Sequence, residues 1–497
     1  MVVFEQYEKY RYKAELEKLG SHLVQRSGIY LFLISFSCLY YLSNASIMLG
    51  HYDLGWHLAA GDLIRDRGSI PFQDPWSFTL GSRQWYNLSW LWDVIASIIF
   101  QYTKLDGLVL CTLACGAIIV GYLASLCLSR GASTAAVCVS VFSACLLYPS
   151  FATPPNVYLA ASPNTVTMLF CVLFYGECLK RARCLLLPVM MVAWVNLHGG
   201  FLLGFLIIGA FGGVALLRRD WKGAKTFALV GISCFAAVFV NPLGWSIFEG
   251  LTATLGHFVQ ANITEWQSYY QNMSVPGSIP GMLYALVFAV FELRLNGLGS
   301  IPLETRLLSW LFLGLGIYQF RYTSFFFLFS TVPLALYLDR LCRDRFNDLE
   351  VRKSVIAAGI VGMCVLPLVF VKMEPAFALP AMLSEKDAEY LQAHFSRARL
   401  LNHWNVGGLL IYRTKGTVPV FVDGRAATAY PDELLRDYFS LVHEDIDERA
   451  WDSVLEKYRI DTVLWVKGHE QLRRFLVDKR GWKEEYAGAN ESVYVKP

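Results

Sequence analysis

The sequence predicts a mainly α-helical membrane protein, in which a polytopic transmembrane helix bundle of about eleven spans precedes a C-terminal soluble α/β domain. The first observation is composition: 55% of the 497 residues are hydrophobic and 17% are charged. This balance is typical of a chain that crosses a membrane repeatedly. The second is a change to a soluble-type composition near residue 374. The formal net charge of +3 gives no sign of a nucleic-acid partner, and none is expected.

Apolar runs long enough, or nearly long enough, to cross the hydrocarbon layer as helices are spread over the first three quarters of the chain. They lie near 28–49, 107–128, 132–150, 163–179, 184–197, 199–217, 226–243, 280–292, 302–318, 322–339 and 354–371. Residues 1–27 are polar and basic, so they are interpreted as a retained cytoplasmic segment. The transmembrane domain is predicted to span 28–373, with a large first outer loop over 50–106.

A further apolar stretch, Leu88 to Gln101, is short and contains an aspartate. If it does not cross the membrane, every cluster of Lys and Arg falls on the inner side, as the positive-inside rule requires. We therefore predict an interfacial or re-entrant helix there. The alternative is that this stretch crosses and a span elsewhere has been missed.

This topology places several polar residues together outside the membrane. They belong to the first loop, to the NLHGG turn, to the TEWQ segment and to the start of FRYTSFFF, and comprise Asp53, His57, Asp74, His198, Glu265 and Arg321. A loop as large as the first one is usually functional. The sequence therefore predicts a reaction chamber at the outer surface of the membrane.

The region 374–497 is predicted to be an extracytoplasmic α/β domain. Strands are expected in ARLLNHWNVGGLLIYR, VPVFVDGR, DTVLWVK and ESVYVKP, and helices in PDELLRDYFSLVHEDI, ERAWDSVLEKYRI and HEQLRRFLVDKRG. The region lacks the glycine-rich signatures of nucleotide-binding loops. The cysteines show no spacing typical of zinc sites.

The motifs together resemble those of bacterial membrane proteins of the GT-C glycosyltransferase type. They are an Asp followed by Trp-His after the first span, GSIPFQDPWSFT, NLHGGF, NPLGW, an EW pair and VFVDGR. The resemblance covers nearly the whole chain. It implies a multi-span enzyme, related in architecture to oligosaccharyltransferases, that takes a sugar from a polyprenyl-phosphate carrier.

The resemblance also implies roles for residues and partners. GT-C enzymes keep an essential acidic residue in the first outer loop, and Asp53 has that position here. The donor is then a lipid-linked sugar, and the acceptor is an envelope glycan, lipid or protein at the outer face of a bacterial inner membrane. A divalent cation such as Mg²⁺ or Mn²⁺, held by His51, Asp53 and His57, is a possible cofactor. Relatives often show paired acidic residues, whereas this chain has a single Asp53.

The chemistry of the transfer supports the same residues. Displacing a lipid phosphate from a sugar carbon needs a base for the incoming hydroxyl and donors for the phosphate oxygens. Asp53 is the predicted base. Arg321 is the predicted phosphate ligand because a guanidinium matches phosphate geometry, and His198 and His57 are predicted to assist it. Asp74 and Glu265 are further candidates for substrate contacts.

Each candidate also has a purely structural alternative. Asp53 could cap the following helix, His57 could form a structural pair with it, His198 could mark a tight turn, and Arg321 could reach to the membrane interface. Asp74 could initiate a turn, and Asp423 and Arg425 could form a turn with its salt bridge. Two other function classes remain open: a non-catalytic membrane protein that binds envelope glycans, and a transporter, for which few charges lie within the spans.

Overall fold

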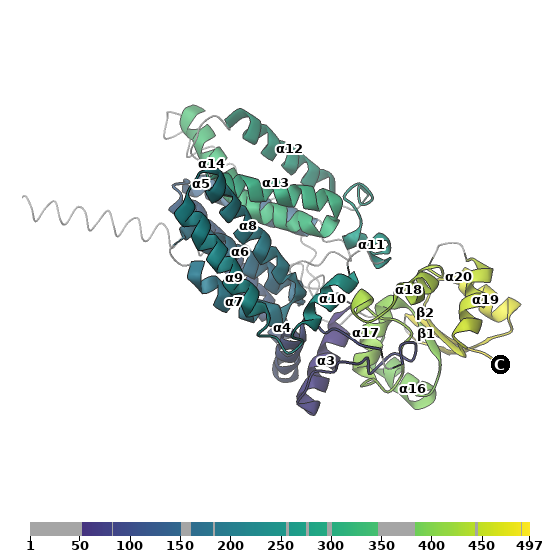
Figure 1. The fold of residues 1–497 in the computed structure, drawn as a ribbon. Coiled ribbons are helices and arrows are strands. Elements are labelled where there is room, and N and C mark those ends of the chain that lie inside the picture. The colour runs from purple at the N-terminus through teal and green to yellow at the C-terminus, as the bar shows by residue number, and fades with distance from the viewer. Residues whose placement is uncertain are drawn as a thin grey trace, which may run out of the picture.

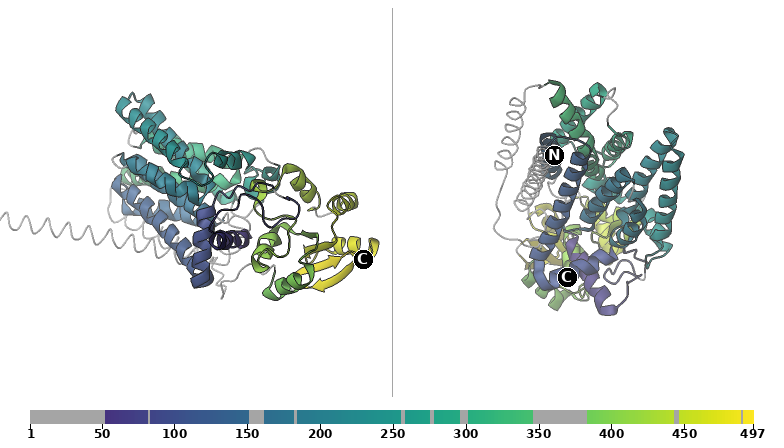
Figure 2. Two further views of the ribbon diagram at one scale, coloured as in Figure 1. Left: turned by 60° about the horizontal axis from the view of Figure 1, so that its bottom comes forward. Right: turned by 90° about the vertical axis from the view of Figure 1, so that its left-hand side faces the viewer.

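The computed structural model of the protein describes residues 52–81, 83–150, 161–181, 184–254, 258–274, 278–295, 301–345, 383–442, 446–488 and 490–497. A bundle of long helices forms one part of the molecule, and a small α/β domain forms the other (Figures 1 and 2). The first loop lies between the two parts. The predicted fold class, mainly helical with a small C-terminal α/β domain, matches this architecture.

The predicted apolar runs that fall within the described residues are all helices. Their bounds are α4 Trp90–Ser129, α5 Thr134–Ser150, α6 Pro163–Lys180, α7 Leu187–Leu197, α8 Leu202–Leu217, α9 Trp221–Val238, α12 Ser278–Leu295, α13 Leu303–Tyr318 and α14 Thr323–Arg345. Short helices α10 Ser246–Thr254 and α11 Val259–Asn262 follow α9. The runs at 28–49 and 354–371 lie outside the described residues.

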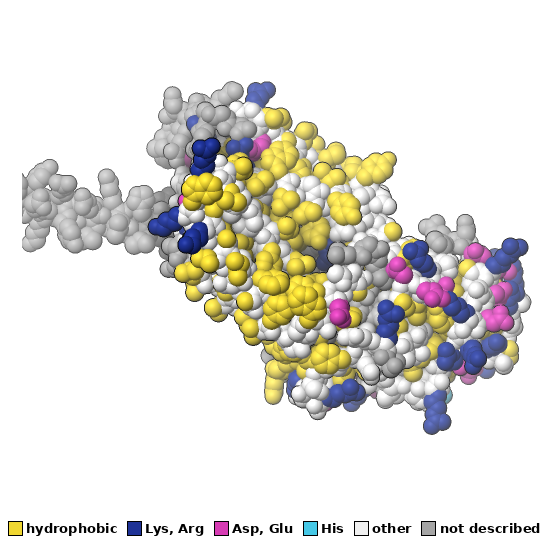
Figure 3. All heavy atoms as spheres, viewed as in Figure 1, with side chains coloured by type: hydrophobic (Ala, Val, Ile, Leu, Met, Phe, Trp, Pro, Cys, Tyr) yellow, Lys and Arg dark blue, Asp and Glu magenta, His cyan; other side chains and the backbone are white. Residues whose placement is uncertain are grey.

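Three of the described helical segments are long and apolar enough to cross a membrane. They are Trp90–Ser129, Gly199–Leu217 and Phe320–Leu341. Hydrophobic side chains cover much of the visible surface of the bundle, whereas charged side chains are concentrated on the C-terminal domain (Figure 3). The surface therefore divides into an apolar part and a water-facing part, as expected for a membrane protein with an external domain.

The stretch Leu88 to Gln101 forms the start of α4. Lys104 has φ 55° and ψ −146°, which breaks the helical path within α4. The part before this kink packs against helix α3, Leu54–Arg67, of the first loop. It is thus a separate helical segment from the apolar run that follows, and its interfacial position remains a prediction.

The C-terminal domain contains one four-stranded sheet with the order β1-β2-β4-β3. Its strands are β1 Leu400–Asn402, β2 Thr462–Val466, β3 Lys483–Ala487 and β4 Glu491–Val495. Strands β1 and β2 are parallel, and the other two pairs are antiparallel. Its helices are α16 Glu385–Phe395, α17 Trp404–Arg413, α18 Asp432–Phe439, α19 Glu448–Lys457 and α20 Glu470–Arg473.

One strand prediction in this domain was right only at its start, where Leu400–Asn402 is β1, and a second one was wrong. The segment Trp404–Arg413 is helix α17, started by His403, whose Nδ1 accepts the Asn405 N–H at 3.3 Å. A short apolar run does not by itself distinguish a buried strand from a buried helix. The segment VPVFVDGR is not a strand of the sheet; Val420 instead forms an isolated parallel bridge with Ser77 of the first loop.

The first loop and the C-terminal domain are packed tightly together where α3 crosses α17. A Cβ atom added at Gly55 would lie 2.4 Å from the carbonyl oxygen of Gly408, and one added at Gly408 would lie 2.8 Å from that of Tyr52. Only glycine allows two backbones to approach so closely. The loop that carries Asp53 is therefore held directly by the C-terminal domain.

The two ends of the helix bundle differ in character. At one end, Arg181 pairs with Asp220 at 2.6 Å and Arg218 pairs with Glu304 at 2.9 Å. At the other end lie the start of α6, the turn between α7 and α8, and the junction of α13 with α14. The predicted site residues His198 and Arg321 belong to this second end, which faces the first loop.

Candidate functional site

A cavity of about 1430 Å³ lies where this second end of the bundle meets the first loop and the C-terminal domain. Five of the predicted residues line it: Asp53, His57, His198, Glu265 and Arg321. They come from four segments that are far apart in the chain, since Asp53 and His57 both lie at the start of α3. The predicted clustering of these residues is therefore present in the fold.

Asp53 precedes α3, at its N-cap position, but its side chain makes no capping hydrogen bond. The alternative that Asp53 caps the helix therefore does not explain the position of its carboxylate. The backbone of Gly424 lies directly beside that carboxylate, because a Cβ atom added to Gly424 would fall 1.6 Å from Asp53 Oδ1. Asp53 is thereby positioned against the VDGR turn of the C-terminal domain and at the cavity wall.

His57 is tied to a different acid from the one expected. Its backbone N–H donates to the Asp53 carbonyl at 3.2 Å, as in a helix, but its Nδ1 lies 2.6 Å from Asp93 Oδ1. Asp93 is fully buried and also accepts a hydrogen bond from Asn87 Nδ2 at 2.8 Å. The ring of His57 stacks on Trp56. His57 therefore forms a structural pair, with Asp93 and not with Asp53.

His198 occupies the turn between α7 and α8, where its Nδ1 lies 2.7 Å from Thr167 Oγ1. That hydroxyl accepts the indole N–H of Trp194 at 3.0 Å. The hydroxyl proton of Thr167 can then be donated to His198 Nδ1. This favours the His198 tautomer with the ring proton on Nε2. Burial, the positive charge of Arg321 and the nearby His57 lower the pKa of His198 to about 3. The neutral ring can donate one hydrogen bond from Nε2.

The lowered pKa of His198 predicts a specific acid sensitivity. The unfolded residue has a pKa of 6.5 and the folded one about 3, so between these values the unfolded chain binds more protons. The contribution of His198 to stability is therefore present above pH 6.5 and decreases as the pH falls toward 3. We expect the melting temperature of the wild type to fall more between pH 7 and pH 5 than that of His198→Gln. Equal falls in the two proteins would contradict this account.

Arg321 lies in the short 3₁₀ helix Phe320–Tyr322 between α13 and α14. Its Nη1 is 3.9 Å from Glu265 Oε1, and its Nη2 donates to Asn164 Oδ1 at 3.4 Å. The guanidinium also lies over the ring of Trp266, 4.3 Å from the centroid. These long polar contacts hold the group at the cavity wall, and they are weaker than charge-assisted bonds of ideal length.

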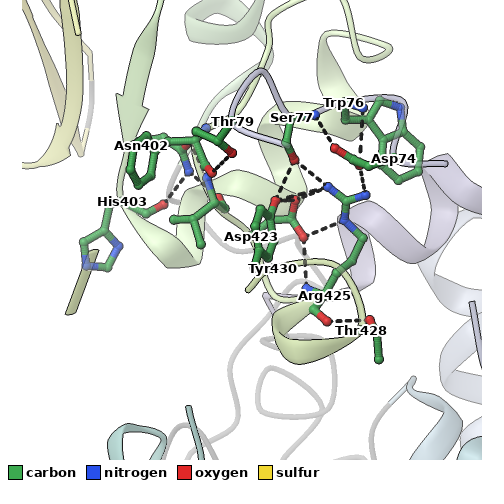
Figure 4. A network of polar contacts seen from close by, with 12 residues as sticks. Asp74, Trp76, Ser77, Thr79, Asn402, His403, Asp423, Arg425, Thr428 and Tyr430 are labelled. Carbon is green, nitrogen blue, oxygen red and sulfur yellow. Dashed lines mark hydrogen bonds and ion pairs between the residues drawn. The ribbon is translucent and has the colours of Figure 1, made fainter. Parts of the chain in front are cut away.

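Asp74 lies outside the cavity lining and belongs to a buried network with the VDGR turn (Figure 4). The Arg425 guanidinium bonds Asp74 Oδ1 and lies 2.7 Å from Asp423 Oδ2. Tyr430 donates to Asp423 at 2.6 Å, and Arg425 also donates to Ser77 at 3.0 Å. The Asp74 carboxylate accepts the Ser77 N–H at 2.8 Å, which confirms the predicted turn. Asp74 is thus used in linking the first loop to the C-terminal domain.

This network carries one cation and two carboxylates, and the side chains of all three residues are fully buried. Burial alone would lower the pKa of Arg425, but the charges of Asp423 and Asp74 raise it well above its ordinary value. The guanidinium therefore stays charged, flanked by the rings of Trp76 and Trp85. Asp423 and Arg425 therefore form a turn with its salt bridge, which was the structural alternative, and Arg425 pairs with Asp74 as well.

The divalent-cation site that the sequence suggested stays a prediction, because one of its three members is not among the described residues. The described residues contain no group of three or more His, Cys, Asp or Glu side chains placed to hold a metal ion. Of the three expected ligands, His57 is hydrogen-bonded to Asp93 through Nδ1, and Asp53 lines the cavity. Hard cations prefer several oxygen ligands. His51 lies outside the described residues.

Sequence reasoning missed several residues that shape the site. Of these residues, Asp93 is the one that the sequence could have revealed, because an acid within an apolar helix must find a partner. Gly424 and Asn164 gave no local signal, since their contacts depend on segments distant in the chain. Trp266 belongs to the EW pair of the motifs, but the position of its ring under Arg321 follows from tertiary packing alone.

No known family matches the chain by sequence, and no curated protein sequence matches it. Solved structures do match. The archaeal oligosaccharyltransferase AglB from Archaeoglobus fulgidus, in complex with an inhibitory peptide and a dolichol-phosphate, superposes with a TM-score of 0.62 at 12% identity, covering 90% of this chain and 71% of that one. The same organism's enzyme in complex with Zn and sulfate gives 0.54 at 12% identity, over 93% and 73%.

A bacterial structure also matches. ArnT from Cupriavidus metallidurans, bound to undecaprenyl phosphate, superposes with a TM-score of 0.53 at 12% identity, covering 94% of this chain and 98% of that chain. These neighbours are GT-C glycosyltransferases. The resemblance noted in the sequence is confirmed at the level of the fold: this chain has the fold of the GT-C glycosyltransferases.

Proposed function

We propose that the protein is a membrane glycosyltransferase that moves a sugar from a polyprenyl-phosphate-linked donor to an acceptor at the outer face of the membrane. The observation that carries this proposal is the shared cavity, which brings a carboxylate, a guanidinium and a neutral imidazole to one place. The structural neighbours bind dolichol-phosphate or undecaprenyl phosphate, which supports a lipid phosphate as the donor group.

In this proposal Asp53 is the general base. It accepts the proton of the acceptor hydroxyl as that oxygen forms its bond to the sugar carbon. The bond from this carbon to the phosphate oxygen breaks, and its electron pair leaves with the lipid phosphate. Helix α3 and the VDGR turn hold the carboxylate for this step.

Arg321 and His198 receive the charge that develops on the phosphate. The guanidinium supplies two N–H donors in a fixed plane, and Nε2 of the neutral His198 supplies a third. Asn164 and Glu265, which contact Arg321, orient the guanidinium. Preorganised donors in a cavity act more strongly than the same groups in water.

The acceptor in this proposal is an envelope glycan, lipid or protein, and the membrane is the bacterial inner membrane with the C-terminal domain outside. The wide cavity, which is also lined by C-terminal residues such as Trp404 and Asn405, has room for both substrates. Each step given above is carried out by side chains of the chain itself.

Binding of undecaprenyl phosphate tests the assignment of Arg321. We expect Arg321→Gln to weaken binding of this lipid to the purified protein by roughly tenfold to a hundredfold, the loss expected for hydrogen bonds to a charged group. Arg321→Lys should lose less, because it keeps the charge. Arg218→Gln, at the opposite end of the bundle, is the control and should bind normally. Equal binding by Arg321→Gln and the wild type would exclude Arg321 from the phosphate site.

A further inference from the structure

We infer that the VDGR turn of the C-terminal domain is a positioning element for Asp53, in which Gly424 sets the place of the reacting carboxylate. This inference rests on the proposed function and adds to it. It assigns a role in the reaction to a domain that the sequence interpretation treated as separate from the site.

The first support is the fit between Gly424 and Asp53. The space that a Cβ atom would need at position 424 is occupied by the carboxylate: Oδ1 would be 1.6 Å away and Cγ 2.6 Å away. Gly424 does not have a positive φ, so its backbone would accept alanine without strain. The reason for glycine here is therefore the room it leaves for the acid.

The second support is the rigidity of the turn. The residues on either side of Gly424 are Asp423 and Arg425, and both side chains are fully buried. Arg425 N–H donates to Asp423 Oδ1 at 2.9 Å within the turn, while the guanidinium reaches across to Asp74. A turn that is fixed at both flanking residues cannot move away to accommodate a displaced carboxylate.

The third support is that the same network ties the turn to the loop that carries the acid. Asp74 and Asp53 both belong to the first loop, and Asp74 lies 351 positions from Arg425 in the chain. The close contact of Gly55 with Gly408 provides a second attachment beside Asp53. Loop and turn therefore form one rigid frame, and the Asp53 carboxylate lies inside it.

Replacing Gly424 with alanine tests the inference. We expect Gly424→Ala to reduce kcat for consumption of the lipid-linked donor by roughly a hundredfold, since a displacement of about 1 Å can have that effect. Binding of undecaprenyl phosphate should change less than about twofold, because Arg321 and His198 are untouched. In Asp53→Asn, which already lacks the base, the same glycine change should cause no further loss of activity, because residues that act together are not additive.

A matched control exists in the same domain. A Cβ atom at Gly488 would lie 2.6 Å from Asp387 Oδ1, a clash of the same kind but less close than the one at Gly424, and Gly488 does not line the cavity. Gly488→Ala should lower the melting temperature and leave kcat unchanged. If Gly424→Ala keeps the wild-type kcat, or if both alanine variants lose activity in proportion to stability, the positioning role is wrong.

A cysteine pair tests the geometry without any assay of transfer. In the variant Asp53→Cys with Gly424→Cys, the two Cβ atoms lie within roughly 4 Å, inside the range of disulfides. We expect this pair to cross-link on mild oxidation, and the pair Asp62→Cys with Gly424→Cys not to do so. Absence of the cross-link would overturn the inference. Cross-linking of this pair, together with a wild-type protein that neither binds undecaprenyl phosphate nor consumes donor, would instead locate the failure in the proposed function.

Discussion

Asp53→Asn is expected to abolish sugar transfer while leaving the protein folded. The substitution keeps the shape of the side chain beside Gly424 and removes its basicity, and general-base catalysis contributes typically a hundredfold to ten-thousandfold. It does not remove a helix cap, because the Asp53 side chain makes no capping bond. Cells that lack the protein should accumulate its lipid-linked donor. The wild type should clear this intermediate, and Asp53→Asn should not.

Asp62→Asn provides the control for this experiment. Asp62 lies on the same helix α3 but does not line the cavity, and it pairs with Arg65 at 3.4 Å. This variant should clear the intermediate as the wild type does. If Asp53→Asn also clears it, Asp53 is not the base, and the alternative of a non-catalytic glycan-binding protein gains support.

Arg425→Met is expected to give the largest loss of stability. It leaves Asp423 and Asp74 buried without their cation, and breaking a buried pair in this way costs about 3–5 kcal/mol. Because the network joins the first loop to the C-terminal domain, the two should separate at a lower denaturant concentration. Tryptophan fluorescence reports this directly, since Trp76 and Trp85 flank the guanidinium.

Two comparisons make the Arg425 experiment specific. Arg480→Met breaks an exposed pair with Asp452, and should lose far less stability because water screens that pair. Adding Asp74→Asn and Asp423→Asn to Arg425→Met should recover part of the loss, since no uncompensated charge then remains. A loss no greater than that of Arg480→Met would show that the network does not hold the two parts together.

The sequence was sufficient for the parts of the fold that depend on local pattern. Apolar runs predicted the helices of the bundle, and the positions of His198 and Arg321 at helix ends predicted that they meet Asp53 at one end. The resemblance to GT-C enzymes pointed to Asp53, and the chemistry of phosphate binding pointed to Arg321 and His198. These features follow from the length and composition of single segments, which is why they are visible without coordinates.

The remaining features depend on contacts between distant segments. Nothing local to His57 shows that its partner is Asp93, and nothing local to Gly424 shows that a carboxylate fills the space beside it. The pairing of Asp74 with Arg425 is of the same kind. The helix at Trp404–Arg413 was mistaken for a strand because its apolar pattern suits either state, and its contact with α3 joins segments that are distant in the chain.

A structure of the protein with undecaprenyl phosphate tests the central claim most directly. The account predicts phosphate density inside the cavity, bound by Arg321 and Nε2 of His198, with the Asp53 carboxylate facing the position of the transferred sugar. Phosphate bound outside this cavity, or too far from Asp53 for one sugar to reach both groups, would contradict the account.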